Sequence, residues 1–136
     1  MESEYVFGTG IDIIEVQRVK RTIERHPNFL GRIFTVPEIR YCSSKKKPDS
    51  MYISFEQRFA AKEAVSKALG TGIGKNARFC EIEIINEESG KPTVRLSGKT
   101  GFFASSNKVS HIEISLSGLK DYAIAYAIAF MKNYRK

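Results

Sequence analysis

The stretch that decides this fold is residues 58–72, RFAAKEAVSKALGTG, in which a long helix ends at about Leu69. One apolar arc of the helix is formed by Phe55, Phe59, Val65 and Leu69. At about 100° per residue, Lys62 falls inside this arc, and Glu63 and Lys67 lie at its edge. A lysine is rarely buried unless its ammonium finds a partner or reaches solvent. We therefore expect the chemistry of the protein on this helix.

Glu63 and Lys67 are four residues apart, so they project from the same side of the helix. The two residues could form an ordinary surface ion pair, worth about 0.3–0.5 kcal/mol. Alternatively, the Glu63 carboxylate holds a cation while the Lys67 ammonium binds an anion. A second carboxylate, Asp12, follows the apolar run 5–11, and we expect it at the exit of a strand. Gly8 and Gly10 in that run mark either a bulge or a close approach of another backbone.

Spacing and capping signals predict the other elements. Helices are expected over about 15–25, 35–42 and 49–69, with a Thr35/Glu38 capping box on the second and Asp49 or Ser50 capping the third. Alternation predicts a hairpin of strands over 81–84 and 93–96, a short helix over 97–107 and a strand over 112–116. Residues 122–130 alternate large side chains with alanine, which favours a strand over an alanine-rich helix. Its shallow alanine face suits the long helix.

The fold class expected is α+β, in a single small domain over residues 1–136 with an antiparallel sheet packed on the long helix. A net charge of +7 predicts attraction to polyanions without identifying one. The two cysteines, Cys42 and Cys80, have no metal-binding spacing and there is no apolar leader, so we expect a cytoplasmic setting. No apolar run approaches the roughly 20 residues that span a bilayer, so no membrane insertion is expected.

Three motifs together resemble one family. Gly10-Ile11-Asp12, Phe59-Ala60-Ala61-Lys62-Glu63-Ala64 with Lys67-Ala68, and Gly70-Thr71-Gly72 are similar to motifs of the holo-acyl-carrier-protein synthases, the short class of 4′-phosphopantetheinyl transferases. Their order and separation extend the resemblance over nearly the whole chain. It implies the 4′-phosphopantetheinyl transferase fold, with the active site at a trimer interface. The large face of Tyr122, Tyr126 and Phe130 is the candidate for the trimer core.

The resemblance implies transfer of the 4′-phosphopantetheine arm from coenzyme A, the substrate, to a serine of apo acyl carrier protein. It makes Asp12 and Glu63 ligands of Mg²⁺ or Mn²⁺, which suits a hard cation that takes one or two carboxylates plus phosphate oxygens. Glu63 and Lys67 become the catalytic residues, since Glu63 helps to deprotonate the serine and Lys67 contacts the pyrophosphate.

Two further sets of residues follow from the same resemblance. Coenzyme A is expected to contact Arg58, Lys62, Lys67, Gly70, Thr71, Gly72, Ser117 and Gly118. From the residues alone, Arg58 is equally an ordinary surface charge, and Lys62 could instead hold Glu63 or anchor the helix. The carrier protein is expected to dock on Arg18, Arg25 and Arg32, a basic row that would otherwise be a solvated helix face.

One departure from the family pattern leaves an alternative open. The family carries Ser-His-Thr before its final strand, whereas this chain has Ser117-Gly118-Leu119. In the family that histidine lies near the coenzyme phosphates, so a catalytically degenerate binder of carrier protein or coenzyme A competes with a transferase of reduced activity. A basic nucleic-acid-binding domain is the weakest interpretation, because the aromatic residues follow apolar patterns and no nucleic-acid motif is present.

Overall fold

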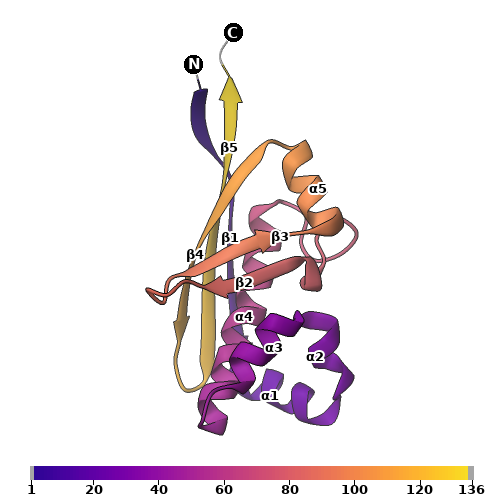
Figure 1. Cartoon of the computed structure of the whole chain (residues 1–136), viewed down its shortest axis with the longest axis vertical. Coiled ribbons are helices and arrows are strands. Elements are labelled where there is room, and N and C mark those ends of the chain that lie inside the picture. Colours follow the sequence, from indigo (N-terminus) through magenta and orange to yellow (C-terminus); the bar gives the residue numbers. More distant parts are fainter. Residues whose placement is uncertain (1, 135–136) are drawn as a thin grey trace.

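The computed structural model describes the chain from residue 2 to residue 134, and the side chains of residues 3–132. Its elements follow in the order β1 (Glu2–Glu15), α1 (Val16–Arg25), α2 (Asn28–Ile33), α3 (Val36–Ser43), α4 (Pro48–Ala68), a 3-10 turn η1 (Phe79–Glu81), β2 (Ile82–Asn86), β3 (Pro92–Leu96), α5 (Gly98–Ser106), β4 (Val109–Gly118) and β5 (Tyr122–Tyr134). Figure 1 shows long strands along one side and the three short helices α1–α3 grouped at one end. The predicted α+β class is confirmed.

The five strands described form two separate antiparallel sheets. The long sheet has the order β1-β5-β4, and the β2–β3 hairpin forms a separate sheet with Ile82 opposite Leu96. The predicted hairpin and the short helix that follows it are therefore both present. Residues 122–130 are a strand rather than an alanine-rich helix, because alternation places every alanine on the same side of β5.

The inner face of the long sheet packs against α4 through small residues. On β5 the buried residues are Ala123, Ala125, Ala127 and Ala129, and on α4 they are Ala60, Ala61, Ala64 and Ala68. A Cβ atom on Gly10 would overlap the carbonyl oxygen of Ala64, and one on Gly8 would overlap that of Ala68. A register shift also separates Val6 from Gly8, so Gly8 marks a bulge and both glycines admit the helix backbone.

The expectation that Asp12 lies at the exit of a strand was wrong. Strand β1 does not end before Asp12 but runs on to Glu15, which lies opposite Tyr122. The reason is the length of β5, which offers backbone partners to β1 along its whole course. Asp12 therefore lies within the strand, opposite Ala125, on the side that faces α4.

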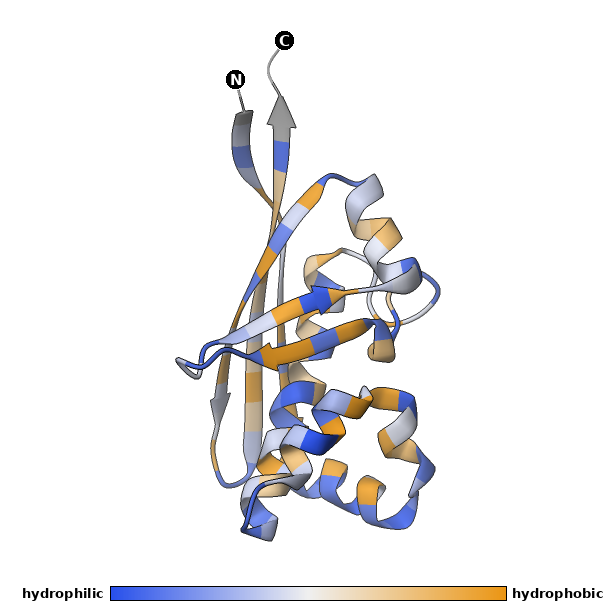
Figure 2. Cartoon of the chain, viewed as in Figure 1, coloured by the Kyte–Doolittle hydropathy of each residue, from blue (hydrophilic) through white to orange (hydrophobic). Residues whose placement is uncertain are grey.

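The helical end has its own core, to which α1 contributes the buried residues Val19 and Ile23. Apolar and hydrophilic residues alternate along these helices in Figure 2. The predicted capping box is present at the start of α3, where Thr35 and Glu38 exchange side-chain and backbone hydrogen bonds. The cap expected for α4 was wrong, since its N-cap is Lys47 and Pro48 occupies the first turn, a position for which proline is suited.

Helix α4 ends as predicted, with Leu69 at the C-cap and Gly70 next, at a φ of 84° that glycine adopts readily. In the described part of the chain, no helix has the length and apolar character needed to cross a membrane.

Candidate active site

A pocket of about 550 Å³ lies where β1, α1 and α4 meet, and both predicted carboxylates line it. Its lining residues are Asp12, Ile13, Ile14, Glu15, Arg18, Val19, Thr22, Phe29, Phe59 and Glu63. Asp12 reaches the pocket from the strand and Glu63 from the helix packed on it. The close glycine–alanine packing of β1 on α4 brings these two distant parts of the sequence together.

The two oxygens of Asp12 have different surroundings. Oδ1 accepts a hydrogen bond from Nζ of Lys67 at 3.2 Å, and the same ammonium donates to the carbonyl oxygen of Ile11 at 2.9 Å. Oδ2 is buried and, among the described residues, has no hydrogen-bond partner. A buried carboxylate oxygen without a partner is costly, so this oxygen is suited to receive a ligand from outside the chain.

Glu63 is half-buried beside Asp12. Burial raises the pKa of the Glu63 carboxyl, the Asp12 carboxylate raises that pKa further, and Lys67 opposes both effects. Two neighbouring carboxylates in a partly desolvated pocket repel each other until a cation lies between them. The donor set therefore fits a hard divalent cation such as Mg²⁺.

Lys67 and Glu63 do not form the helix ion pair that their spacing allowed. In the described part of the chain, the ion pair of Lys67 is with Asp12 across the helix–strand contact. The Lys67 side chain is 48% exposed, so its ammonium lies at the pocket rim and remains accessible to an anion.

Two residues expected at the coenzyme lie elsewhere. Lys62 is fully buried, and its ammonium is 2.7 Å from Glu38 Oε1 and 2.9 Å from the carbonyl oxygen of Phe79. Burial lowers the pKa of Lys62, an effect that Glu38 opposes. Arg58 is also buried and donates to Ser54 and to Asn86. We correct both assignments, because each cation is enclosed by groups of its own chain.

The loop after α4 is open but uses its own N–H groups. Gly70 donates to the carbonyl oxygen of Lys67, and Thr71 and Gly72 both donate to that of Ser66. A Cβ atom on Gly70 or Gly72 would have nothing within 4 Å. The loop can therefore lie against a ligand, although these three N–H groups are not available to bind phosphate.

Ser117 and Gly118 do not line the pocket of their own chain. Gly118 lies at the end of β4, where a Cβ atom would be 2.6 Å from Nε2 of Gln57 and 3.5 Å from Ile53. Ser117 is exposed, opposite Ile124 on the outer side of the sheet.

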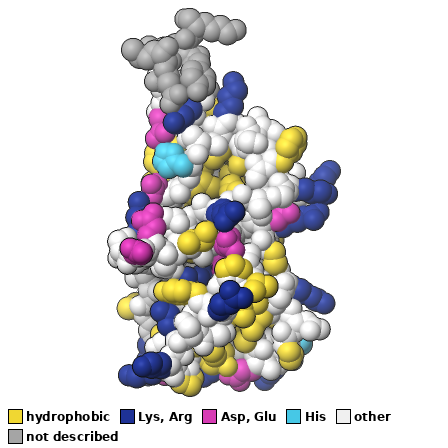
Figure 3. All heavy atoms as spheres, viewed as in Figure 1, with side chains coloured by type: hydrophobic (Ala, Val, Ile, Leu, Met, Phe, Trp, Pro, Cys, Tyr) yellow, Lys and Arg dark blue, Asp and Glu magenta, His cyan; other side chains and the backbone are white. Residues whose placement is uncertain are grey.

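Arg18, Arg25 and Arg32 are all exposed and line adjoining hollows. Arg18 belongs to the carboxylate pocket, Arg18 and Arg25 to a second hollow, and Arg25 and Arg32 to a third. Basic side chains are also spread over the helical end of the face seen in Figure 3. The three arginines thus mark a continuous surface that begins at the carboxylates.

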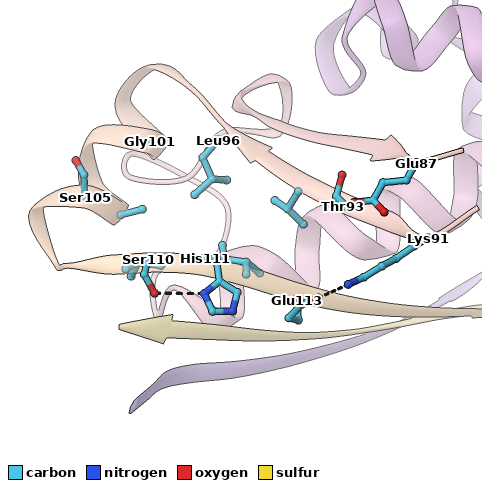
Figure 4. A pocket seen from close by; sticks show the side chains of 13 residues that line it. Glu87, Lys91, Thr93, Leu96, Gly101, Ser105, Ser110, His111 and Glu113 are labelled. Atoms are coloured by element: carbon cyan, nitrogen blue, oxygen red, sulfur yellow. Dashed lines mark hydrogen bonds and ion pairs between the residues drawn. The ribbon is translucent and has the colours of Figure 1, made fainter. Parts of the chain in front are cut away.

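Another hollow, of about 450 Å³, lies between β3, α5 and β4 (Figure 4). Three of its charged or titratable groups already have partners, because Lys91 is 3.4 Å from Glu113 and His111 is 3.6 Å from Glu4. The His111 ring also stacks on Phe130. The carboxylate pocket is therefore the better candidate for chemistry.

Two glutamates were missed by sequence reasoning. Glu38 was assigned only to the capping box, yet it is the buried partner of Lys62. Glu56 is fully buried, and neither of its oxygens has a partner within residues 2–134. The available signal was its position seven residues before Glu63, which places both on one side of α4.

Comparison with known proteins agrees with this geometry. Residues 8–127 match the 4′-phosphopantetheinyl transferase superfamily. The chain is 55% identical over 120 residues to a holo-[acyl-carrier-protein] synthase of Ruminiclostridium cellulolyticum, covering 88% of each protein.

Solved structures agree as well. The holo-[acyl-carrier-protein] synthase of Neisseria meningitidis superposes with a TM-score of 0.82 at 32% identity, covering 92% of this chain and 98% of the other. The Bacillus anthracis synthase, in complex with CoA (3′,5′-ADP), superposes with a TM-score of 0.78 at 34% identity, covering 93% and 97%. This chain belongs to the 4′-phosphopantetheinyl transferase superfamily.

Proposed function

We propose that the protein is a holo-[acyl-carrier-protein] synthase, which transfers the 4′-phosphopantetheine arm of coenzyme A to a serine of apo acyl carrier protein. The products are holo acyl carrier protein and adenosine 3′,5′-bisphosphate. The observation that carries the proposal is the convergence of Asp12 and Glu63 in one pocket, with Oδ2 of Asp12 unpartnered among the described residues and Lys67 at the rim. The high identity to named synthases supports it.

Asp12 and Glu63 would hold Mg²⁺ or Mn²⁺. Within residues 2–134, no group of three metal-ligating His, Cys, Asp or Glu side chains is found. Two carboxylates suffice for Mg²⁺, which completes its shell with water and phosphate oxygens. When bound, the cation neutralises charge on the pyrophosphate of coenzyme A.

The reaction exchanges one phosphorus–oxygen bond for another. The serine oxygen attacks the β-phosphorus, and the bond from that phosphorus to the oxygen bridging toward the α-phosphate breaks. Glu63, placed in the pocket beside Asp12, accepts the serine proton. Lys67 stabilises the negative charge that develops on the departing adenosine 3′,5′-bisphosphate. The open loop of Gly70, Thr71 and Gly72 borders the same substrate.

Arg18, Arg25 and Arg32 would receive the carrier protein. Their continuous surface leads into the carboxylate pocket, so an acidic carrier docked there would present its serine to Glu63. Exposed charges of this kind act mainly on association rate, and their effect weakens as salt screens them.

We also propose a homotrimer. The outer face of the long sheet exposes Ile11 (60%), Ile13 (61%), Tyr122 (45%) and Tyr126 (40%), and Phe130 lies on the same face. An apolar face of this kind is costly in water and is covered when subunits associate. A neighbouring subunit could then bring Ser117 and Gly118 to the carboxylate pocket. Light scattering that shows only monomer at micromolar concentration would contradict this assembly. We also propose a cytoplasmic setting, which the two free thiols Cys42 and Cys80 support, because such an environment keeps thiols reduced.

The second candidate, a degenerate binder, is favoured by one observation. Gly118 stands where the family has histidine, and Gln57 fills the space beside it. Such a protein would bind apo carrier and coenzyme A without releasing adenosine 3′,5′-bisphosphate.

Nucleotide release separates the two candidates. We expect adenosine 3′,5′-bisphosphate to appear, by liquid chromatography, when the protein is mixed with coenzyme A, Mg²⁺ and apo carrier. It should not appear with a carrier whose acceptor serine is replaced by alanine. Binding of the carrier without nucleotide release would establish the binder instead.

A further inference from the structure

The buried pair Lys62–Glu38 lies directly beside the candidate active site in sequence. Both side chains are completely inaccessible to solvent, and Nζ of Lys62 is 2.7 Å from Oε1 of Glu38. The ammonium also donates to the carbonyl oxygen of Phe79 at 2.9 Å and lies 5.5 Å from the ring centre of Phe34. The cation is therefore held by three different segments of the chain.

Glu38 connects still more of the fold. Its Oε1 also accepts from the backbone N–H of Thr35 at 2.9 Å, and its Oε2 accepts from that of Ile84 at 2.9 Å. One carboxylate thus joins the start of α3, the middle of α4 and strand β2. Unlike Oδ2 of Asp12, both of its oxygens are used.

The opposite side of α4 is packed closely against the sheet. There the helix meets the sheet through alanines and glycines, which set its distance from the sheet, and through the Lys67–Asp12 ion pair at the edge of the contact. A buried ion pair adds little net stability over an apolar pair, but its ammonium is satisfied in only one arrangement. Lys62 therefore adds a second, directional anchor on the side of α4 that faces away from the sheet.

Glu63 is the residue next to Lys62, and Lys67 is little more than one turn further. A small rotation or slide of α4 would carry both away from Asp12. We propose that the Lys62–Glu38 pair is a positioning device, which fixes α4 so that Glu63 and Lys67 reach Asp12, and that Lys62 does not contact coenzyme A. This inference rests on the proposed function, because that function assigns a cation to Asp12 and Glu63.

Binding of Mn²⁺, followed by electron paramagnetic resonance without coenzyme A, tests the inference directly. The variants are Lys62→Met, Lys62→Met with Glu38→Gln, and Lys99→Met, which changes an exposed lysine of α5. The double variant removes the unpaired buried charge, while the amide oxygen of the introduced glutamine can still accept a backbone hydrogen bond. Thermal unfolding confirms that each variant is folded, and calorimetry measures coenzyme A affinity.

The expected result is that the double variant unfolds at a temperature close to that of the wild type and yet binds Mn²⁺ about tenfold more weakly, the scale of the loss when a metal ligand's support is removed. Coenzyme A affinity should stay within about twofold, since Lys62 is enclosed. Lys99→Met should match the wild type in both measurements.

Other outcomes overturn the inference in distinguishable ways. Unchanged Mn²⁺ affinity in the folded double variant would make the pair merely structural. Loss of coenzyme A affinity with unchanged Mn²⁺ affinity would make Lys62 a substrate contact. Failure of the wild type to bind Mn²⁺ at all would remove the metal from the proposed function, and the inference with it.

Discussion

Helix α4 is packed by different means on its two sides. Toward the sheet it presents alanines against the alanines of β5 and against Gly8 and Gly10, and Lys67 adds an ion pair with Asp12 at the edge of this contact. Toward α1, α3 and β2 it presents charged groups, of which Lys62 is fully partnered and Glu63 and Glu56 are not. The first side sets the distance between helix and sheet, and the second carries the chemistry.

The difference shows how a small domain places a site between distant segments. Small residues let β1 approach α4 closely enough for Asp12 and Glu63 to share a pocket. Changes to the two carboxylates of the pocket, Asp12 and Glu63, should then alter activity more than stability, and changes on the small side should do the reverse.

Asp12→Asn or Glu63→Gln should have the largest effect. Each should lower kcat/KM by about 10³-fold, because each removes a carboxylate that holds the cation and, for Glu63, the proton acceptor. The stability of each variant should equal or exceed that of the wild type, since carboxylate repulsion is relieved. Steady-state kinetics and thermal unfolding measure the two quantities. A variant that lost activity only through unfolding would contradict the assignment.

Gly10→Ala should break the small-residue side. The new Cβ atom would meet the carbonyl oxygen of Ala64, part of a helix backbone that cannot yield cheaply. We expect a loss of about 3 kcal/mol in the free energy of unfolding, at the upper end of overpacking effects. Urea denaturation measures it. Gly31→Ala is the control, because no atom lies within 4 Å of its new Cβ atom and alanine favours a helix. Equal stability of the two variants would show that the contact is not tight.

Glu56 predicts a dependence of stability on pH. Burial raises its pKa from 4.5 to about 8, while Lys20 opposes the rise. The folded protein keeps this proton at pH values where the unfolded chain has lost it, so stability is greatest below about 4.5 and falls as pH rises toward 8. Glu56→Gln should remove that decline, worth roughly 1–3 kcal/mol. Urea denaturation from pH 5 to 8.5 compares the two proteins, and parallel curves would count against a buried neutral acid.

The arginine surface should give the smallest effect. Replacing Arg18, Arg25 and Arg32 together by alanine should raise KM for the carrier about five- to tenfold at low salt, and less at high salt. KM for coenzyme A should not change. Arg95→Ala, on an exposed arginine of β3, is the matched control. An effect as large from Arg95 would mean that general charge, and not this surface, attracts the carrier.

Local signals in the sequence predicted most of the fold. The alternation in 122–130, the capping box at Thr35 and the glycine stop at Gly70 each act within a few residues, and all three are present. The end of β1 was misplaced because its length depends on pairing with β5, more than 100 residues away. The requirement of Lys62 for a partner followed from its place in an apolar arc, but the choice of Glu38 depends on tertiary structure.

The candidate site divides in the same way. Asp12 and Glu63 were expected to converge, and they line one pocket. Arg58 could not be placed from sequence, because its burial depends on the contact of α4 with the β2–β3 hairpin. Its partner Ser54 lies one turn earlier on the same helix, and its partner Asn86 lies on β2. Glu56 was missed because its burial depends on tertiary packing, and its spacing of seven residues from Glu63 does not by itself show that burial.

The mass of apo acyl carrier protein after incubation with this protein and coenzyme A tests the central claim most directly. With Mg²⁺ the carrier should gain about 340 Da, the mass of the phosphopantetheine arm. The gain should disappear with a chelator and with Asp12→Ala or Glu63→Ala. A gain that persists in either variant would contradict the assignment of the two carboxylates, and no gain with the wild type would contradict the transferase itself.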